Sequence, residues 1–380
     1  MRRLQSDIGS KKGQMKNKSG IIKEQCLIGY DNAINFIPYY TSDVWSNDGK
    51  YFIFYCQKDG RISLNRYFSD DGRCEEVLDM GKWSSSYRAK NDPYADMVVS
   101  GHVRNTETVL VPFDNRICHI SIPGKSSRFS KAVFPDDSEL AGPFHVSDDG
   151  KYLAGVNYRR TDAKLEKTSI FVYDIGKEKI LFLEEIDFWA NHTQFFSNAE
   201  HILFCHEGPT ETIPARLHLL EWRKGVHYPI YPQKHNSKGE LVEFVGHEMP
   251  AGDKVVAVRY PVSRMEDFGI ILVDPETKTG EFIDHDDYLH VASNAAGSLF
   301  VMDTCWWGNT KRKTEDQSDI FLYDNRTKKK HFLASVCCSM KNQIYHVHPR
   351  LNRAGDIVLA TAKESVDLPN AKILYLELAV

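Results

Sequence analysis

A segment of about fifty residues that recurs along the chain is the feature that most constrains its fold. In each unit, a short turn rich in Gly, Asn and Asp separates two apolar runs that are typical of strands. These turn segments begin at seven positions: Ser46, Arg104, Ser147, Ser197, Pro250, Asn294 and Asn352. Most units then close with a run such as SIFVYDI or DIFLYD, so each supplies about four strands. Because helical signals are scarce and the spacing is even, we predict an all-β, seven-bladed β-propeller rather than a sandwich or two stacked barrels.

The chain is expected to form one domain. Its 380 residues are 42% hydrophobic, which is enough apolar material for a large core. Residues 1–18 are polar and are predicted to form a flexible N-terminus, so the propeller domain spans residues 19–380. The segment GIIKEQCLIG, residues 20–29, could add a strand to the last blade and so close the ring.

Charge and targeting signals exclude several classes of partner. The 48 basic and 52 acidic residues are spread along the chain and give a formal charge of -4, so nothing favours nucleic acid or an anionic membrane. The basic N-terminus contains no apolar run of the signal-peptide type, and no stretch approaches membrane-spanning length. These features predict a cytoplasmic location. Eight cysteines without a C-x-x-C motif favour reduced, mostly buried thiols. The oligomeric state is left open.

Histidines occupy one position of the repeat in five of the units. Each lies just before the turn, in the segment that forms the innermost strand of a propeller blade and lines the central channel. They are His145, His192, His247, His290, and His346 with His348. Because equivalent positions of successive blades surround one axis, we predict that these distant residues gather near one mouth of the channel.

The stretch NQIYHVHPR, residues 342–350, is the densest part of this pattern. The spacing of His346 and His348 places both on one face of a strand, whereas Gln343 can join them only from a loop or a bulge. A third imidazole from a neighbouring blade, most simply His290, would complete a set of three nitrogens and one amide oxygen. Such a set suits Mn, Fe, Ni or Zn. The alternative is an H-x-H pair on the surface or in a satisfied polar core.

Several stretches together resemble the oligogalacturonate lyases, seven-bladed β-propellers that act on short pectin fragments. These stretches are CHEGP at residues 205–209, Arg216, VGHE at residues 245–248 and Q-x-x-H-x-H at residues 343–348. The resemblance spans most of the chain and implies a divalent metal, Mn²⁺, held by His290, Gln343, His346 and His348. It also implies that His247 is the catalytic base, that Arg216 binds substrate, and that the substrate is a short acidic oligosaccharide.

Two stretches depart from the family. NFIPYY, residues 35–40, replaces an early His-Arg segment, and Leu217-His218 stands where a tryptophan is expected. These differences leave the metal ligands in place. They leave open which uronate is bound and how long its chain is.

The residues implied by the resemblance suit β-elimination from a uronic acid, which removes the C5 proton beside the carboxylate and expels the oxygen at C4. A cation held by neutral ligands stabilises the charge that builds on that carboxylate. His247 near the ion would stay neutral and accept a proton, while Arg216 offers a planar donor fork to a carboxylate. His192, His206 and Tyr345 are further candidates for substrate contacts.

Three alternative functions follow from the same features. The first is a lyase of the same mechanism that acts on a different uronate-containing oligosaccharide. The second is a non-catalytic ligand-binding propeller, since the fold alone implies no chemistry, although the chain lacks a regular GH…WD repeat signature. The third, a propeller that regulates an attached hydrolase, is disfavoured because the sequence contains no G-x-S-x-G motif or α/β domain.

Overall fold

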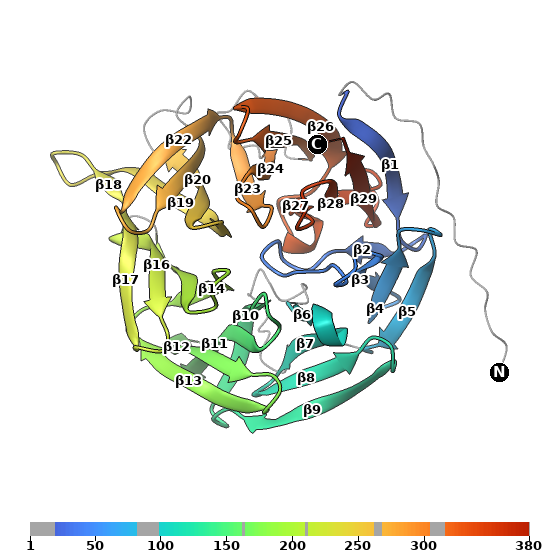
Figure 1. Ribbon diagram of the computed structural model, residues 1–380, viewed down its shortest axis with the longest axis horizontal. Coiled ribbons are helices and arrows are strands. Elements are labelled where there is room, and N and C mark those ends of the chain that lie inside the picture. The colour runs from blue at the N-terminus through green and yellow to red at the C-terminus, as the bar shows by residue number, and fades with distance from the viewer. Residues whose placement is uncertain are drawn as a thin grey trace.

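The strands of the protein form sheets arranged in a ring around a common axis (Figure 1). The computed structural model describes residues 20–81, 99–161, 164–209, 212–261, 268–304 and 316–379. The predicted flexible N-terminus, residues 1–18, lies outside these ranges. The all-β, propeller-like architecture is confirmed. No helix in the described part of the chain is long and apolar enough to cross a membrane.

Four sheets consist of strands that follow one another in the sequence. The first contains β6 (Gly101–Val103), β7 (Thr108–Phe113), β8 (Arg116–Ser121) and β9 (Ser126–Val133), with the 3-10 helix η1 (Arg104–Thr106) after β6. The second contains β10 (Ser138–Val146), β11 (Tyr152–Thr161), β12 (Lys164–Asp174) and β13 (Lys179–Ile186). The third contains β14 (Ala190–Phe195), β15 (His201–His206), β16 (Ala215–Glu221) and β17 (Val226–Pro232). The fourth contains β18 (Lys234–His235), β19 (Leu241–Ala251), β20 (Lys254–Pro261), β21 (Gly269–Asp274) and β22 (Thr279–His285).

A 12-stranded sheet occupies the rest of the ring (Figure 1). One part contains β23 (Tyr288–Ser293), β24 (Leu299–Thr304), β25 (Gln317–Asp324) and β26 (Lys329–Cys337). A second part contains β27 (Arg350–Leu351), β28 (Ile357–Lys363), β29 (Ala371–Leu378) and β1 (Ile22–Ile28), preceded by the 3-10 helix η3 (Gln343–Tyr345). A third part contains β2 (Ile34–Phe36), β3 (Tyr51–Lys58), β4 (Arg61–Phe68) and β5 (Cys74–Asp79).

The two ends of the described chain meet in this 12-stranded sheet. β1 pairs antiparallel with β29, so the segment GIIKEQCLIG adds a strand beside the C-terminal one, as predicted. β26 also pairs with β28, and β2 pairs with β29. Because these pairings join the three parts without a break, the strand pattern does not divide the ring into seven separate sheets. The count of seven blades stays a prediction.

The turns of the repeat are held by short polar side chains. In the SDDG turn before β11, Ser147 Oγ donates to Asp149 Oδ1 over 2.7 Å, and a backbone N–H two residues further on donates to the same oxygen. Gly150 takes a φ of 71°, a conformation that costs glycine little because it has no Cβ. The SNDG turn before β3 repeats these contacts with Ser46 and Asp48. The sequence signal that marks the repeat therefore has one chemical cause in both units.

The apolar faces of neighbouring sheets pack against each other to form the core. Between the second and third sheets, Val156, Ile170 and Phe204 are at most 1% exposed and belong to one cluster. Burial of a side chain of this size contributes about 1.5–3 kcal/mol to folding. This packing holds the strands β14, β19 and β23 in place, and these strands carry three of the predicted site residues, His192, His247 and His290.

Candidate functional site

Three strands each carry a histidine at a break in their pairing. The register shifts beside His192 in β14, His247 in β19 and His290 in β23. At such a bulge an extra residue bends the strand and redirects its side chains. His192 and His247 take positive φ angles of 53° and 48°, which cost a residue with a Cβ about 1–2 kcal/mol. Backbone strain of this kind is typical of functional sites.

The segment around His346 and His348 differs from the predicted innermost strand, and the structure corrects that prediction. Residues 346–349 lie between η3 and β27 and belong to no strand. Pro349 has no N–H to donate to a ladder, and His348 takes a φ of 43°. Gln343 enters from η3, outside any strand. The histidines thus approach the axis through a bent segment and not through strand periodicity.

His290, His346 and His348 form a buried cluster in which one ring nitrogen of each lies within 4.8 Å of the others. His290 Nε2, His346 Nδ1 and His348 Nε2 are buried and have no hydrogen-bond partner among the described residues. Gln343 Oε1 is likewise buried without a partner in the part of the chain that the structure describes. Buried polar atoms in native proteins are normally paired. Three imidazole nitrogens and one amide oxygen fit a divalent first-row metal ion.

Asp303 orients the His290 imidazole. The Nδ1 atom of His290 lies 2.9 Å from Asp303 Oδ1 and 3.0 Å from Oδ2, and the His290 backbone N–H donates to the same carboxylate. Because a carboxylate accepts hydrogen bonds, the ring proton lies on Nδ1 and the lone pair lies on Nε2, which faces the cluster. Carboxylate–histidine pairs of this kind orient metal ligands in proteins. The sequence analysis missed Asp303, which lies opposite His290 in the β23–β24 register.

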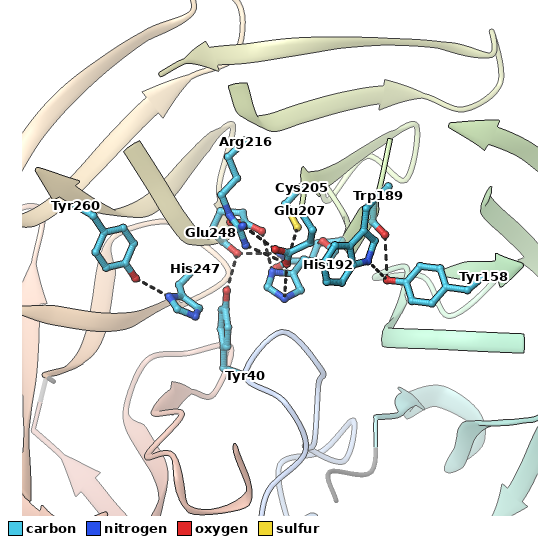
Figure 2. Close-up of polar contacts among 12 residues, drawn as sticks. Tyr40, Tyr158, Trp189, His192, Cys205, Glu207, Arg216, His247, Glu248 and Tyr260 are labelled. Carbon is cyan, nitrogen blue, oxygen red and sulfur yellow. Dashed lines mark hydrogen bonds and ion pairs between the residues drawn. The ribbon is translucent and has the colours of Figure 1, made fainter. Parts of the chain in front are cut away.

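His247 lies beside this cluster, with its ring centroid 4.5 Å from that of His290. Its Nδ1 atom is 2.6 Å from the Tyr260 hydroxyl (Figure 2). That hydroxyl donates its proton to the Leu289 carbonyl over 2.9 Å. The Nδ1–H of His247 therefore donates to Tyr260, and the lone pair lies on Nε2. Burial, with the nearby His290 and Arg216, holds the pKa of His247 well below its usual range. The sequence analysis did not identify Tyr260.

Arg216 lies between the buried Glu248 and the partly buried Glu207 (Figure 2). Its Nη1 and Nη2 atoms donate to Glu207 over 3.0 and 3.2 Å, and Nε donates to Glu248 over 3.3 Å. His192 Nδ1 lies 3.0 Å from the other oxygen of Glu248. Burial opposes ionisation, but the Arg216 charge and the His192 hydrogen bond lower the pKa of Glu248 to about 2. Both glutamates lie in the CHEGP and VGHE motifs of the sequence, but no role for either could be predicted from those motifs.

The chain enters the middle of the ring after β2 (Figure 1), through residues 37–42, which we call the channel segment. Tyr39 and Tyr40 of this segment are 0% and 1% exposed. The Tyr39 ring lies 5.0 Å from the rings of both His192 and His348. The Tyr40 hydroxyl donates to the backbone carbonyl of Glu248 over 3.3 Å. The aromatic pair therefore lies between the histidine cluster and the His192–Glu248 pair.

Arg350 fixes the channel segment from the other side. Its guanidinium is 3% exposed and donates to the backbone carbonyls of Pro38, Tyr39 and Ser42. Burial lowers the pKa of this guanidinium to about 9. A pocket of about 130 Å³ lies against Arg350 and the channel segment, and His145 is among its lining residues.

Three histidines and a tyrosine from the sequence predictions lie in other surroundings. His145 accepts a hydrogen bond from Phe195 N at Nδ1, so it does not extend the metal cluster. The His206 ring stacks on Phe188 with centroids 4.0 Å apart. The Tyr345 hydroxyl donates to the Pro369 carbonyl, and its ring faces Lys363. His192 lies next to Glu248, as described above. Contact of His192, His206 or Tyr345 with substrate stays a prediction.

The sequence matches no protein-family profile and no curated protein. Among solved structures, the chain is similar to an oligogalacturonate lyase in complex with manganese, at 16% identity and a TM-score of 0.78, over 98% of this chain and 96% of that one. It is also similar to an oligogalacturonate lyase from Vibrio parahaemolyticus, at 16% identity and a TM-score of 0.76, over 98% of both chains. A puromycin-hydrolysing peptidase from Mycobacterium tuberculosis matches at 12% identity and a TM-score of 0.59, over 90% of this chain but 52% of that one. The protein thus has the fold of the oligogalacturonate lyases.

Proposed function

We propose that the protein is a metal-dependent lyase that cleaves short uronate oligosaccharides, such as oligogalacturonides, by β-elimination. The observation that carries the proposal is the convergence of three unpaired buried imidazole nitrogens, of His290, His346 and His348, next to His247. Gln343, whose Oε1 is also buried without a partner among the described residues, is the proposed fourth ligand. Mn²⁺ is the first ion to test, because a similar lyase structure contains manganese.

His247 is the proposed general base. Its Nδ1–H is engaged by Tyr260, so Nε2 carries the lone pair that accepts the C5 proton of the uronate. Its lowered pKa keeps the imidazole neutral at physiological pH, the form that a base requires. A divalent ion held by the four neutral ligands would supply positive charge to the substrate carboxylate as its negative charge grows.

Arg216 is the proposed binding group for an acidic part of the substrate. Its contacts with Glu207 and Glu248 use three N–H donors, and a guanidinium has five. The remaining donors are attached to a group whose orientation is already fixed by two carboxylates. A fixed donor fork loses little side-chain entropy when it binds a carboxylate.

The second candidate is the same elimination on a different uronate-containing oligosaccharide. The channel segment favours it, because Tyr39 and Tyr40, in the stretch that departs from the family pattern, lie against His192 and His348. Two aromatic rings at this place restrict the shape of any sugar that reaches His247. A panel of uronate disaccharides, assayed with the same protein, distinguishes the two candidates.

The proposal is tested with digalacturonate and Mn²⁺, with detection of the unsaturated product by its ultraviolet absorbance and by mass spectrometry. We expect His348→Ala to lose both metal and turnover, and His247→Ala to keep metal and lose turnover. His145→Ala is the matched control, since it removes a histidine at the same position of the repeat that has another partner. Metal content and turnover that do not differ among the three variants would refute the assignment. Bound metal without elimination of any uronate would favour a non-catalytic binding protein.

A further inference from the structure

A second group of metal-ligating side chains lies on β14, on β15 and just after β15. One ligand atom each of His192, Cys205 and Glu207 lies within 4.8 Å of the other two. Cys205 Sγ is 3.4 Å from Glu207 Oε1, and His192 Nε2 is 3.8 Å from the same oxygen. Bonds of about 2.0–2.3 Å to a tetrahedral ion place neighbouring ligand atoms about 3.3–3.7 Å apart. Two edges of the group are therefore already close to the spacing that such an ion requires.

His192 is prepared as a ligand in the same way as His290. Its Nδ1–H donates to Glu248, which leaves the lone pair on Nε2. The side chain is 1% exposed, and Nε2 has no hydrogen-bond partner among the residues that the structure describes. The His290–Asp303 pair has the same arrangement: a buried carboxylate on Nδ1 and an unpaired Nε2. This resemblance within one molecule indicates that both Nε2 atoms serve as ligands.

The charges around this group also favour a cation. Glu207 and Glu248 bring two negative charges against the single positive charge of Arg216. A divalent ion bound to the Cys205 thiolate and to a neutral His192 would balance these charges. Burial of an unbalanced charge is costly, so compensation by an ion stabilises the site.

We propose that His192, Cys205 and Glu207 bind a second divalent ion of the thiophilic class, with Zn²⁺ as its representative. The combination of a thiolate, an imidazole and a carboxylate suits Zn²⁺, and three protein ligands leave a fourth position for water or another ligand. On binding, the Cys205 thiol loses its proton to solvent as the sulfur–metal bond forms, so uptake releases one proton per ion. The ligands of this site are distinct from those of the proposed lyase metal, and the inference does not rest on the proposed function.

Glu207 connects this second site to Arg216. The carboxylate oxygen nearest Cys205 and His192 also accepts from Arg216 Nη2. An ion on that oxygen would withdraw negative charge from the Arg216 pair. Occupancy of the second site therefore makes the Arg216 fork more available to an acidic ligand.

The test is Co²⁺ substitution in the intact protein, followed by absorption spectroscopy and elemental analysis. A thiolate–Co²⁺ bond gives a charge-transfer band in the near ultraviolet, which imidazole and amide ligands cannot give. We expect the band in wild type, its loss in Cys205→Ser, and its retention in Cys118→Ser, which changes another buried thiol outside the group. We also expect Cys205→Ser to bind one ion fewer per chain than wild type.

Two further variants keep the result interpretable. His348→Ala should retain the band while it loses the other ion, so failure of the lyase metal site is separated from failure of this one. If Cys205→Ser does not fold, His192→Gln must lose the same band. A wild-type spectrum without a thiolate band, or a band that survives in folded Cys205→Ser or His192→Gln, would overturn the proposal.

Discussion

Replacement of Asp303 by Asn tests how strongly one carboxylate controls the histidine cluster. Asp303 is 1% exposed and accepts hydrogen bonds from both the backbone N–H and Nδ1 of His290. Asn has nearly the same shape and retains one oxygen, so the backbone contact can survive. The change removes the negative charge that holds the ring proton on Nδ1. If the new amide N–H₂ turns toward Nδ1, the ring proton moves to Nε2 and blocks the lone pair.

The expected effect of Asp303→Asn is a loss of about 10- to 100-fold in Mn²⁺ affinity, or about 1.4–2.7 kcal/mol, the range measured when the partner of a ligating histidine is removed. The assay is a titration of protein with Mn²⁺, in which the magnetic-resonance signal of the free aqua ion reports what remains unbound. Turnover is not needed for this measurement. If Asp303 orients His290, the loss of Mn²⁺ affinity should be about 100-fold when the His290 tautomer changes. It should be about 10-fold when only the negative charge of Asp303 is removed.

Glu243→Gln is the matched control for Asp303→Asn. Glu243 is a buried carboxylate, 3% exposed, with hydrogen bonds from Tyr231 and Arg259. Its contacts are distinct from those of the histidine cluster, so this variant should bind Mn²⁺ as wild type does. Equal affinity of folded Asp303→Asn and wild type would refute the orienting role. An equal loss in both variants would assign the effect to general destabilisation.

Three further predictions follow from single contacts. Tyr260→Phe removes the hydrogen-bond partner of His247 Nδ1, so turnover should fall, but by less than the roughly 10²- to 10⁴-fold that a general base contributes. The affinity for Mn²⁺ should be unchanged, and a loss of bound metal would contradict this prediction. In Arg350→Lys, the lysine cannot reach all three backbone carbonyls of the channel segment that Arg350 binds. The free energy of unfolding, measured with urea, should therefore fall by about 3 kcal/mol. An unchanged unfolding midpoint would refute the role of Arg350 in fixing this segment. Burial lowers the pKa of His119 to about 4, so its contribution to stability is present above about pH 6.5 and is lost as the pH falls toward 4. His119→Gln should therefore reduce the slope of unfolding free energy against pH in that window by up to about 1.4 kcal/mol per pH unit, and an unchanged slope would contradict it.

The repeat in the sequence accounts for much of what could be predicted about the site. It placed His192, His247 and His290 on strands that precede a turn of the repeat, because equivalent turns follow equivalent strands. It failed for His346 and His348, since Pro349 and the φ of 43° at His348 interrupt the strand that periodicity requires. The cluster of His290, His346 and His348 still forms. The bend at His348 and Pro349 lies at the start of the last repeat unit, so the strands of that unit keep their place in the ring.

The partners of the histidines could not be predicted from spacing. Asp303 and Tyr260 act through strand pairing, and register cannot be read from one sequence when several pairings bury the same faces. The contacts of the channel segment are even harder to predict from the sequence. Tyr40 meets Glu248 across 208 residues of sequence, and no local pattern in NFIPYY indicates that contact. Long-range contacts of this kind depend on closure of the whole ring.

The position of the channel segment decides from which end a ligand reaches His247. The pocket lined by Phe195 and Ser293 is formed by the residues that follow the histidines in β14 and β23, so it lies toward the turn end of the first strands. Tyr40 lines this pocket and also contacts His247 and His290. The channel segment is thus placed between the pocket and the histidines. Glu207 follows the end of β15 and Arg216 lies near the start of β16, so both lie at the end of this sheet that is opposite to the turn after β14. Under the proposed function, we therefore expect a uronate to approach His247 from the side of Arg216, so that its acidic group meets the fixed guanidinium before its C5 proton meets the proposed base.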